Sequence, residues 1–209
     1  MNKSTDERTL HEWEDLYRQP GQSHKNRYPD GDIIRFVMRT FPGGERKNKR
    51  VLDLGCGWGN NLRFLCDEGL EAWGIDGSAT ACRHCLTISP NVLLGNMAHL
   101  PFNDDFFDAA IDRNSIQCNT INAVQPIVLE AHRVLKPGGC LYSIMLAQTN
   151  QPERFHAYYL TSPRSRLSRQ AVERIFAPFS SLEIDYDERT YEGGKLHLCQ
   201  WHVIARKKQ

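Results

Sequence analysis

From residue 50 onward, the hydrophobic and polar positions alternate between two kinds of segment. Short apolar runs of strand length occur at 50–54, 71–76, 91–95, 107–112 and 140–146. The intervening segments 60–67, 78–88 and 121–135 carry apolar residues at helical spacing. Strands separated by helices in this way predict a parallel sheet with crossover helices on both faces.

The two ends of the chain have different patterns. Residues 7–18 predict a short helix, with Leu10, Trp13, Leu16 and Tyr17 on one side, and residues 32–41 predict a second. The last sixty residues predict a helix ending near 177 and then two strands joined by EGGK, which is a hairpin signal. The sequence therefore predicts an α/β protein with a seven-stranded, mostly parallel sheet, an antiparallel last strand and helices on both faces.

Composition narrows the class of protein. The chain has 209 residues, which suits one domain, and its 40% hydrophobic and 24% charged residues are typical of a soluble globular protein. A net charge of +1 predicts no general attraction to nucleic acid or to an anionic membrane. No apolar run approaches the roughly 18 residues of a membrane span, and the N-terminus lacks the apolar segment of a signal peptide. We expect a cytoplasmic location.

Seven cysteines are present, mostly within apolar runs. The odd count favours buried, reduced thiols. Cys82 and Cys85 form a CxxC pair, but no second pair or histidine pair accompanies it, so a metal or redox role is disfavoured.

The segment VLDLGCGWGNN, residues 51–61, places three glycines directly after the first predicted strand. Such a turn lets backbone N–H groups approach a nucleotide-like ligand. Asp76, at the end of the second strand, could accept hydrogen bonds from ribose hydroxyls. Both features also suit NAD, but the dinucleotide motif GxGxxG would need glycine where Asn60 stands. Asp53 also precedes the turn, where a pyrophosphate would be repelled and a cationic ligand favoured.

At this point the sequence resembles the class I S-adenosylmethionine-dependent methyltransferases, over roughly residues 50–146. VLDLGCGWGNN resembles their first motif and WGIDGS their ribose-binding strand. GNMAHLPFNDDFFDAAIDRNS resembles their adenine loop and fourth strand, and EAHRVLKPGGCLY the helix and turn before the fifth strand. The resemblance implies a Rossmann-like fold in one methyltransferase domain, 1–209. Its expected parts are an N-terminal helical cap (1–45), a cofactor-binding core (46–146), and an acceptor-side insert with a C-terminal hairpin (147–209).

The resemblance also implies how S-adenosyl-L-methionine, and its product S-adenosyl-L-homocysteine, would be held. The glycine turn should line the methionine portion, and Asp76 should bind the ribose. The adenine should lie between Gly77 and Met97, although core packing is the alternative role for Met97. Asn96 replaces the usual aspartate and can still accept a bond from the adenine amino group. The residues expected to contact the cofactor are Gly55, Cys56, Gly57, Asp76, Gly77, Asn96, Met97 and Arg113, the last at the methionine end.

The methyl acceptor is less well specified. Strand four ends in DRNSIQCN, without the NPPY-type sequence of methyltransferases that act on nucleic-acid bases. Strand five ends in IMLAQTN, without the acidic residues of metal-dependent relatives, so no metal is expected. A small-molecule acceptor methylated on oxygen or nitrogen remains, including anionic acceptors. Methyltransferases acting on protein or tRNA, and a non-catalytic cofactor-binding protein, are the alternatives.

Four residues are candidates for binding the acceptor. Trp13 and Tyr17 lie four apart and would form either an aromatic lid or a hydrophobic contact with the core. Arg164 and Arg166 would either grip a carboxylate or phosphate or belong to a solvated basic loop. The catalytic base is unassigned, with His11 and His156 as candidates because they lie in the regions expected to cover the acceptor. The oligomeric state is left open.

Overall fold

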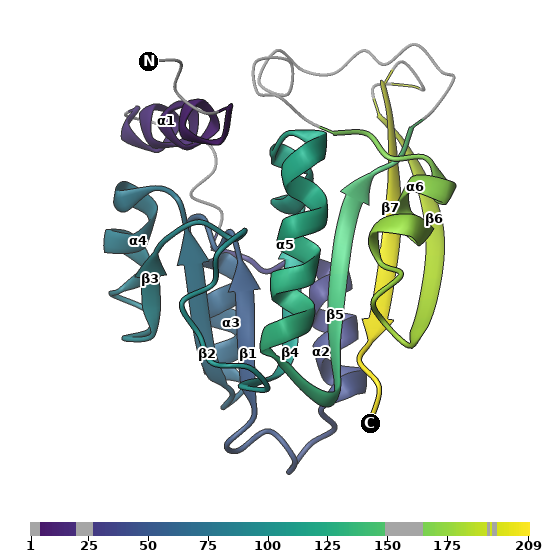
Figure 1. The fold of residues 1–209 in the computed structure, drawn as a ribbon. Helices are drawn as coiled ribbons and strands as arrows, with labels where there is room; N and C mark the ends of the chain where they lie inside the picture. Colours follow the sequence, from purple (N-terminus) through teal and green to yellow (C-terminus); the bar gives the residue numbers. More distant parts are fainter. Residues whose placement is uncertain (1–4, 20–26, 149–164, 192, 194–195) are drawn as a thin grey trace.

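The computed structural model describes residues 5–19, 27–148, 165–191, 193 and 196–209, and it contains one central sheet (Figure 1). Its strands are β1 (Arg50–Leu54), β2 (Glu71–Asp76), β3 (Val92–Leu94), β4 (Phe107–Arg113), β5 (Leu135–Leu146), β6 (Ser181–Tyr191) and β7 (Leu196–Arg206). They lie in the order β3-β2-β1-β4-β5-β7-β6. The neighbouring pairs from β3 to β5 are parallel, and β7 runs antiparallel to both β5 and β6. The predicted fold class is confirmed, with the reversed strand second from the edge.

The helices cover both faces of the sheet. They are α1 (Thr5–Arg18), α2 (Gly31–Thr40), α3 (Asn60–Asp67), α4 (Ala79–Cys85), the 3₁₀ turn η1 (Ile116–Cys118), α5 (Ile121–Val134) and α6 (Arg169–Ile175). The helix starts agree with local capping chemistry. Ser78 Oγ accepts from Ala81 N at 3.1 Å, and Asp30 Oδ1 accepts from Asp32 N at 2.9 Å.

One boundary differs from the sequence prediction. The segment KPGG was expected to separate a helix from a strand beginning at Cys140. Instead β5 begins at Leu135, which pairs with Phe107, and the register then shifts before Cys140 pairs with Ala109. Gly138 adopts a φ of 77°, which glycine tolerates and which lets the strand bulge and continue.

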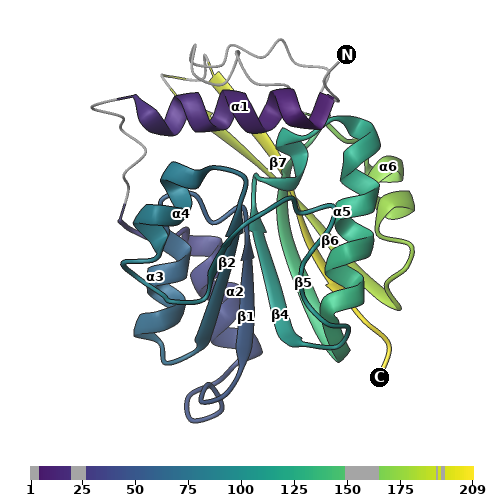
Figure 2. The same ribbon diagram turned by 60° about the vertical axis from the view of Figure 1, so that its left-hand side comes forward.

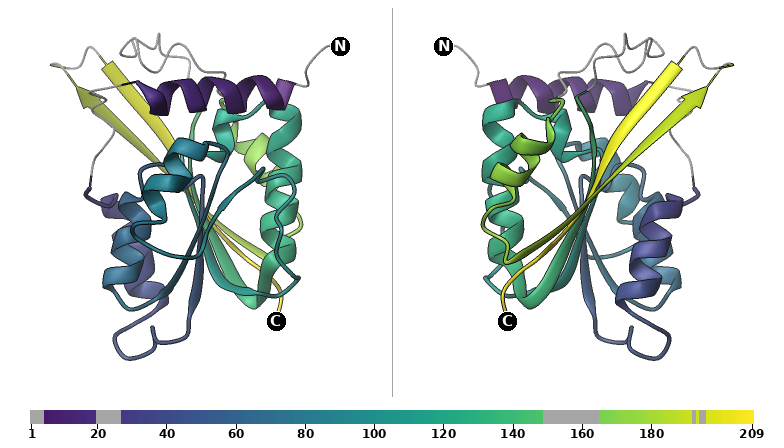
Figure 3. Two further views of the ribbon diagram at one scale, coloured as in Figure 1. Left: turned by 90° about the vertical axis from the view of Figure 1, so that its left-hand side faces the viewer. Right: turned by 90° about the vertical axis from the view of Figure 1, so that its right-hand side faces the viewer.

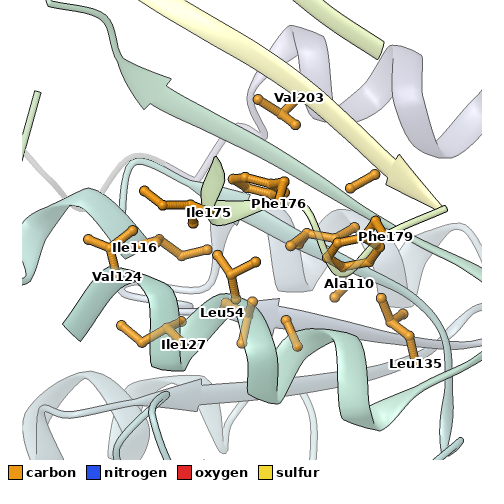
Figure 4. Packing of buried hydrophobic residues seen from close by; sticks show 14 of the residues in the cluster. Leu54, Ala110, Ile116, Val124, Ile127, Leu135, Ile175, Phe176, Phe179 and Val203 are labelled. Carbon is orange, nitrogen blue, oxygen red and sulfur yellow. The ribbon is translucent and has the colours of Figure 1, made fainter. Parts of the chain in front are cut away.

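Two apolar layers pack on the sheet. Helices α5 and α6 cover one face, where Phe176 and Phe179 lie against residues of β4, β5 and β7 (Figure 4). Helices α2, α3 and α4 cover the other face, with Ile33, Phe36 and Val37 of α2 inside the layer. Of the two helices expected in the N-terminal cap, α2 therefore packs on the sheet.

Helix α1 has a different position from all the others. It lies across the edge formed by the carboxyl ends of β1, β2 and β4 (Figures 2 and 3). Neither apolar layer contains any of residues 12–18, the part of α1 whose burial is described. Among the described residues, no helix combines the length and apolar character required to cross a bilayer.

Candidate functional site

The turn between β1 and α3 depends on its glycines. Gly55, Gly57 and Gly59 have φ values of 68°, 52° and 72°, in the region that side chains disfavour. A Cβ on Gly55 would lie 2.4 Å from Ser115 Oγ, and a Cβ on Gly57 would lie 2.7 Å from the Tyr17 hydroxyl. The turn is tied to β2, because the N–H groups of residues 55 and 56 both donate to Ile75 O. The glycines thus allow Ser115 and Tyr17 to lie close to the backbone of the turn.

Replacing Gly55 by alanine should destabilise the turn beyond the backbone strain alone. Gly69 is a matched control, since its φ is 78° but open space surrounds the position of its Cβ. We expect Gly69→Ala to cost about 1 kcal/mol of unfolding free energy, and Gly55→Ala about 1 kcal/mol or more beyond that, because its methyl group overlaps Ser115. Denaturant unfolding measures both. Equal losses would show that Ser115 moves away without cost.

Three carboxyl groups are buried near this turn. Asp53, Asp76 and Asp112 lie at or near the carboxyl ends of β1, β2 and β4, with 2%, 7% and 0% of their surface exposed. Burial, together with the charges of Asp112 and Asp76, raises the pKa of Asp53 to about 8. Burial also raises the pKa of Asp112 to about 6, against hydrogen bonds from Ser143, Ile116 and Ser115. A cation bound here would favour ionisation of all three.

The hydrogen bonds of these carboxyl groups differ. Asp76 accepts from Gly57 N and Ser78 N, both at 2.9 Å, so it already joins β2 to the glycine turn. Burial nonetheless raises the pKa of Asp76. Among the described residues, Asp53 Oδ2 has no hydrogen-bond partner although it is buried. A buried acceptor without a donor suits a ligand that brings its own ammonium or hydroxyl group.

The structure brings several of the predicted residues together. Met97 Sδ lies 3.8 Å from the position of a Cβ on Gly55, and the Met97 side chain also packs against the core under α5. Asn96 Oδ1 accepts from Ala98 N at 2.9 Å, which shapes the loop after β3. Cys56 is buried and contacts Cys85, with the two sulfurs 3.9 Å apart.

Arg113 is engaged by α2. Its Nε donates to Asp30 Oδ2 at 3.0 Å, and the Asp30 backbone N–H donates in turn to Asn61 Oδ1 at 3.1 Å. The guanidinium therefore pins the start of α2 to the end of β4. Its approach to the methionine end stays a prediction, as do the predicted roles of Gly77, Asn96 and Met97 at the adenine.

Helix α1 brings the two aromatic candidates to the glycine turn. The rings of Trp13 and Tyr17 lie 6.1 Å apart, and Tyr17 meets Trp58 of the turn edge-on at 5.1 Å. Trp58 in turn meets His84 of α4 at 5.2 Å. These contacts form a row of rings under α1 at the carboxyl edge of the sheet.

Other candidates lie outside the described residues. These are His156, Arg164 and the side chain of His11. Arg166 is described as an exposed residue beside Leu167, whose backbone bridges to Ala147. The roles of these four residues stay predictions. Within the described ranges, no group of three His, Cys, Asp or Glu residues could hold a metal ion.

Three residues of the site were not singled out from the sequence. Ser115 fills the space beside Gly55, and Asp112 completes the group of buried carboxyls. Glu14 fastens α1 to α4, 64 residues away in sequence from Ser78. Ser115 could have been found from the sequence, because a glycine turn needs a small residue opposite it. Glu14 could not, because the helical pattern of α1 draws attention to its apolar positions.

Comparison with known proteins identifies related sequences. A family of methyltransferase domains matches residues 52–143. A malonyl-[acyl-carrier protein] O-methyltransferase of Pseudescherichia vulneris is 30% identical over 137 residues, 64% of this chain and 53% of that protein. The 2-methoxy-6-polyprenyl-1,4-benzoquinol methylase of Rattus norvegicus mitochondria is 33% identical over 149 residues, 63% of this chain and 45% of that protein. The chain thus spans about half the length of these curated relatives.

Solved structures share the fold. The 1,6-didemethyltoxoflavin-N1-methyltransferase of Burkholderia thailandensis, with its acceptor and S-adenosylhomocysteine bound, has a TM-score of 0.63 and 16% identity. The match covers 97% of this chain and 85% of that one. The similarity to this structure is one of fold. The family of methyltransferase domains matches the part of the chain that contains the glycine turn.

Proposed function

This chain carries a class I S-adenosylmethionine-dependent methyltransferase domain, and we propose that it transfers the methyl group to an oxygen or nitrogen of a small-molecule acceptor. The observation that carries the proposal is the convergence of the glycine turn, Asp76 and the partnerless Asp53 oxygen at the carboxyl edge of the sheet. This edge is where open α/β sheets bind ligands.

The residues present fit S-adenosylmethionine. Its sulfonium and ammonium groups are cations, and three buried carboxyls lie beside the glycine turn. Asp53 Oδ2 would accept from the ammonium, and Asp76 would exchange a backbone bond for the ribose hydroxyls. The turn would follow the methionine portion, since its glycines carry no side chain of their own.

The cofactor supplies a methyl group that its sulfonium already activates for in-line displacement. What remains for the chain is to position the acceptor and exclude water. Tyr17 covers the turn from α1 with Trp13 beside it, and Ser115 borders the turn from the segment after β4, so an acceptor approaching from the carboxyl edge would meet these side chains. A base is needed only for a weakly acidic hydroxyl or a protonated amine.

The names of two related proteins state the methylated atom. One is an O-methyltransferase and the other an N1-methyltransferase, whereas the name of the benzoquinol methylase leaves the atom open. We extend to this chain only the chemical class of reaction. A cytoplasmic location is part of the proposal, because seven free thiols suit a reducing compartment.

Two measurements test the proposed function. Titration calorimetry with S-adenosylmethionine and S-adenosylhomocysteine tests binding, and absence of heat with both would refute the cofactor assignment. Screening of acceptors with a labelled methyl donor then tests the reaction. Label in small molecules is expected, whereas label only in RNA or protein would favour the macromolecular alternative, and label in none would favour a binding protein.

The basic segment around Arg166 supplies a further prediction. The double variant Arg164→Ala with Arg166→Ala should raise the KM for an anionic acceptor roughly tenfold, because charge-assisted hydrogen bonds are lost. Cofactor affinity should not change. Arg174→Ala, an exposed arginine of α6, serves as the control. Weaker cofactor binding in the double variant would instead make this segment part of the cofactor site.

A further inference from the structure

The part of helix α1 whose burial is described, residues 12–18, stays outside the core of the molecule. None of residues 12–19 is buried, and neither apolar layer includes any of residues 12–18. The helix nevertheless lies across the whole carboxyl edge of β1, β2 and β4 (Figure 2). Elements with little buried apolar surface open at low cost in free energy. Specific contacts must therefore hold α1 in this position.

One carboxylate of α1 accepts several hydrogen bonds from the start of α4. Glu14 accepts from Ser78 Oγ at 2.5 Å, from Thr80 Oγ1 at 2.8 Å and from Thr80 N at 3.1 Å. Its partners lie directly after Asp76, at the start of α4. Partial burial raises the pKa of Glu14, but these hydrogen bonds outweigh it and lower the pKa to about 2. The contact is thus charged at physiological pH, so something other than a pH change must open it.

The helix closes the residues that the cofactor must reach. The Tyr17 hydroxyl lies 2.7 Å from where a Cβ of Gly57 would be, which leaves little room above the turn. Gly57 is buried, and only 7% of Asp76 is exposed. A cofactor bound to the turn and to Asp76 would therefore be enclosed beneath α1, and it could not enter past α1 in this position.

We propose that α1 is a cofactor lid and that Glu14 is its latch. The latch, defined as Glu14 with Ser78 and Thr80, releases to admit S-adenosylmethionine and closes again with Tyr17 above the methionine portion. The proposal rests on the proposed function, since it concerns entry to the same site. Glu14 is a positioning residue, acting on binding through the placement of α1.

Stopped-flow fluorescence with S-adenosylhomocysteine tests the latch. Trp58 of the turn packs against Tyr17 of α1, which Trp13 also contacts, so both tryptophans would report closure. We expect Glu14→Ala to raise both the association and the dissociation rate constants about tenfold, because several charge-assisted hydrogen bonds no longer hold the lid. Thr80→Val, which removes one of these bonds, should act in the same direction and more weakly. Glu12→Ala, an exposed glutamate of the same helix, should change neither rate constant.

A second measurement, amide hydrogen exchange, distinguishes loss of the latch from general misfolding of the variant. In the wild-type protein, bound S-adenosylhomocysteine should slow amide hydrogen exchange in α1, and Glu14→Ala should reduce that protection. Binding with unchanged rate constants in Glu14→Ala, or with unchanged exchange in α1, would refute the lid and leave the proposed function intact. If the wild-type protein bound neither ligand, the proposed function and the lid would both be wrong.

Discussion

Asp76→Ala should weaken the binding of S-adenosylmethionine by about 10- to 150-fold, equivalent to about 1.5–3 kcal/mol for hydrogen bonds to a charged group. Two losses contribute. The ribose hydroxyls would lose their acceptor, and the N–H of Gly57 would lose the carboxylate that holds the turn against β2. Titration calorimetry measures the change directly.

Asp76→Asn separates the two losses. The amide oxygen can still accept from Gly57 N, so the turn should stay in place while the charge is lost. The amide NH2 group then faces Ser78 N, whose bond to the second carboxylate oxygen is lost, so we expect a loss of about 1 kcal/mol in unfolding free energy. We expect an affinity between those of the wild type and Asp76→Ala. Unchanged affinity in both variants would show that Asp76 does not bind the ribose and serves only the turn.

Asp53 should make the stability of the ligand-free protein fall as the pH rises. Its pKa is about 8 in the folded protein against 3.8 without the fold, so the folded state keeps a proton that the unfolded state releases. Between these values the contribution of Asp53 declines by up to about 1.4 kcal/mol per pH unit, and above a pH of about 8 it levels off. The unfolding free energy of Asp53→Asn should not show this decline, because the asparagine binds no such proton. The unfolding free energy of the variant minus that of the wild type should therefore increase as the pH rises across this range.

Thermal unfolding of both proteins between about pH 5 and pH 9 shows whether the stability of the wild type falls relative to Asp53→Asn as the pH rises. Asp67→Asn, an exposed aspartate at the end of α3, is the control and should show no growing difference. A constant difference between Asp53→Asn and the wild type would show that Asp53 is ionised at low pH in the folded protein.

The same group links cofactor affinity to pH. A ligand bearing cations should bind better to the ionised carboxyl, so the affinity of the wild-type protein should rise with pH until Asp53 is deprotonated. Binding should then release protons near neutral pH. Calorimetry in buffers with different ionisation enthalpies measures that release, and Asp53→Asn should diminish it.

Much of the fold followed from local patterns. The apolar runs RVLDL and EAWGID coincide with β1 and β2, and Asn60–Asp67 coincides with α3. These segments are short and bounded by glycine or charged residues, so their limits are marked locally. The start of β5 was missed because KPGG reads as a break, whereas Gly138 lets the strand bulge and continue.

The role of α1 shows why local patterns stop short of the site. Its apolar spacing predicts the helix and places Trp13 and Tyr17 on one side. It does not say whether that side meets the core or the glycine turn. In the structure none of residues 12–18 of α1 belongs to either apolar layer, and Tyr17 meets Trp58 and lies close to Gly57.

By itself, the sequence determined the fold class, the glycine turn, the acid at the end of the second strand and the resemblance to class I methyltransferases. Each of these is carried by residues close together in the chain, where spacing and backbone geometry act directly. Only the tertiary structure decided which distant groups share one edge of the sheet. Parallel strands bring Asp53, Asp76 and Asp112 together in a buried cluster, and α1 brings Glu14 against Ser78, 64 residues away. Burial and pairing across such separations depend on packing, which no local pattern records.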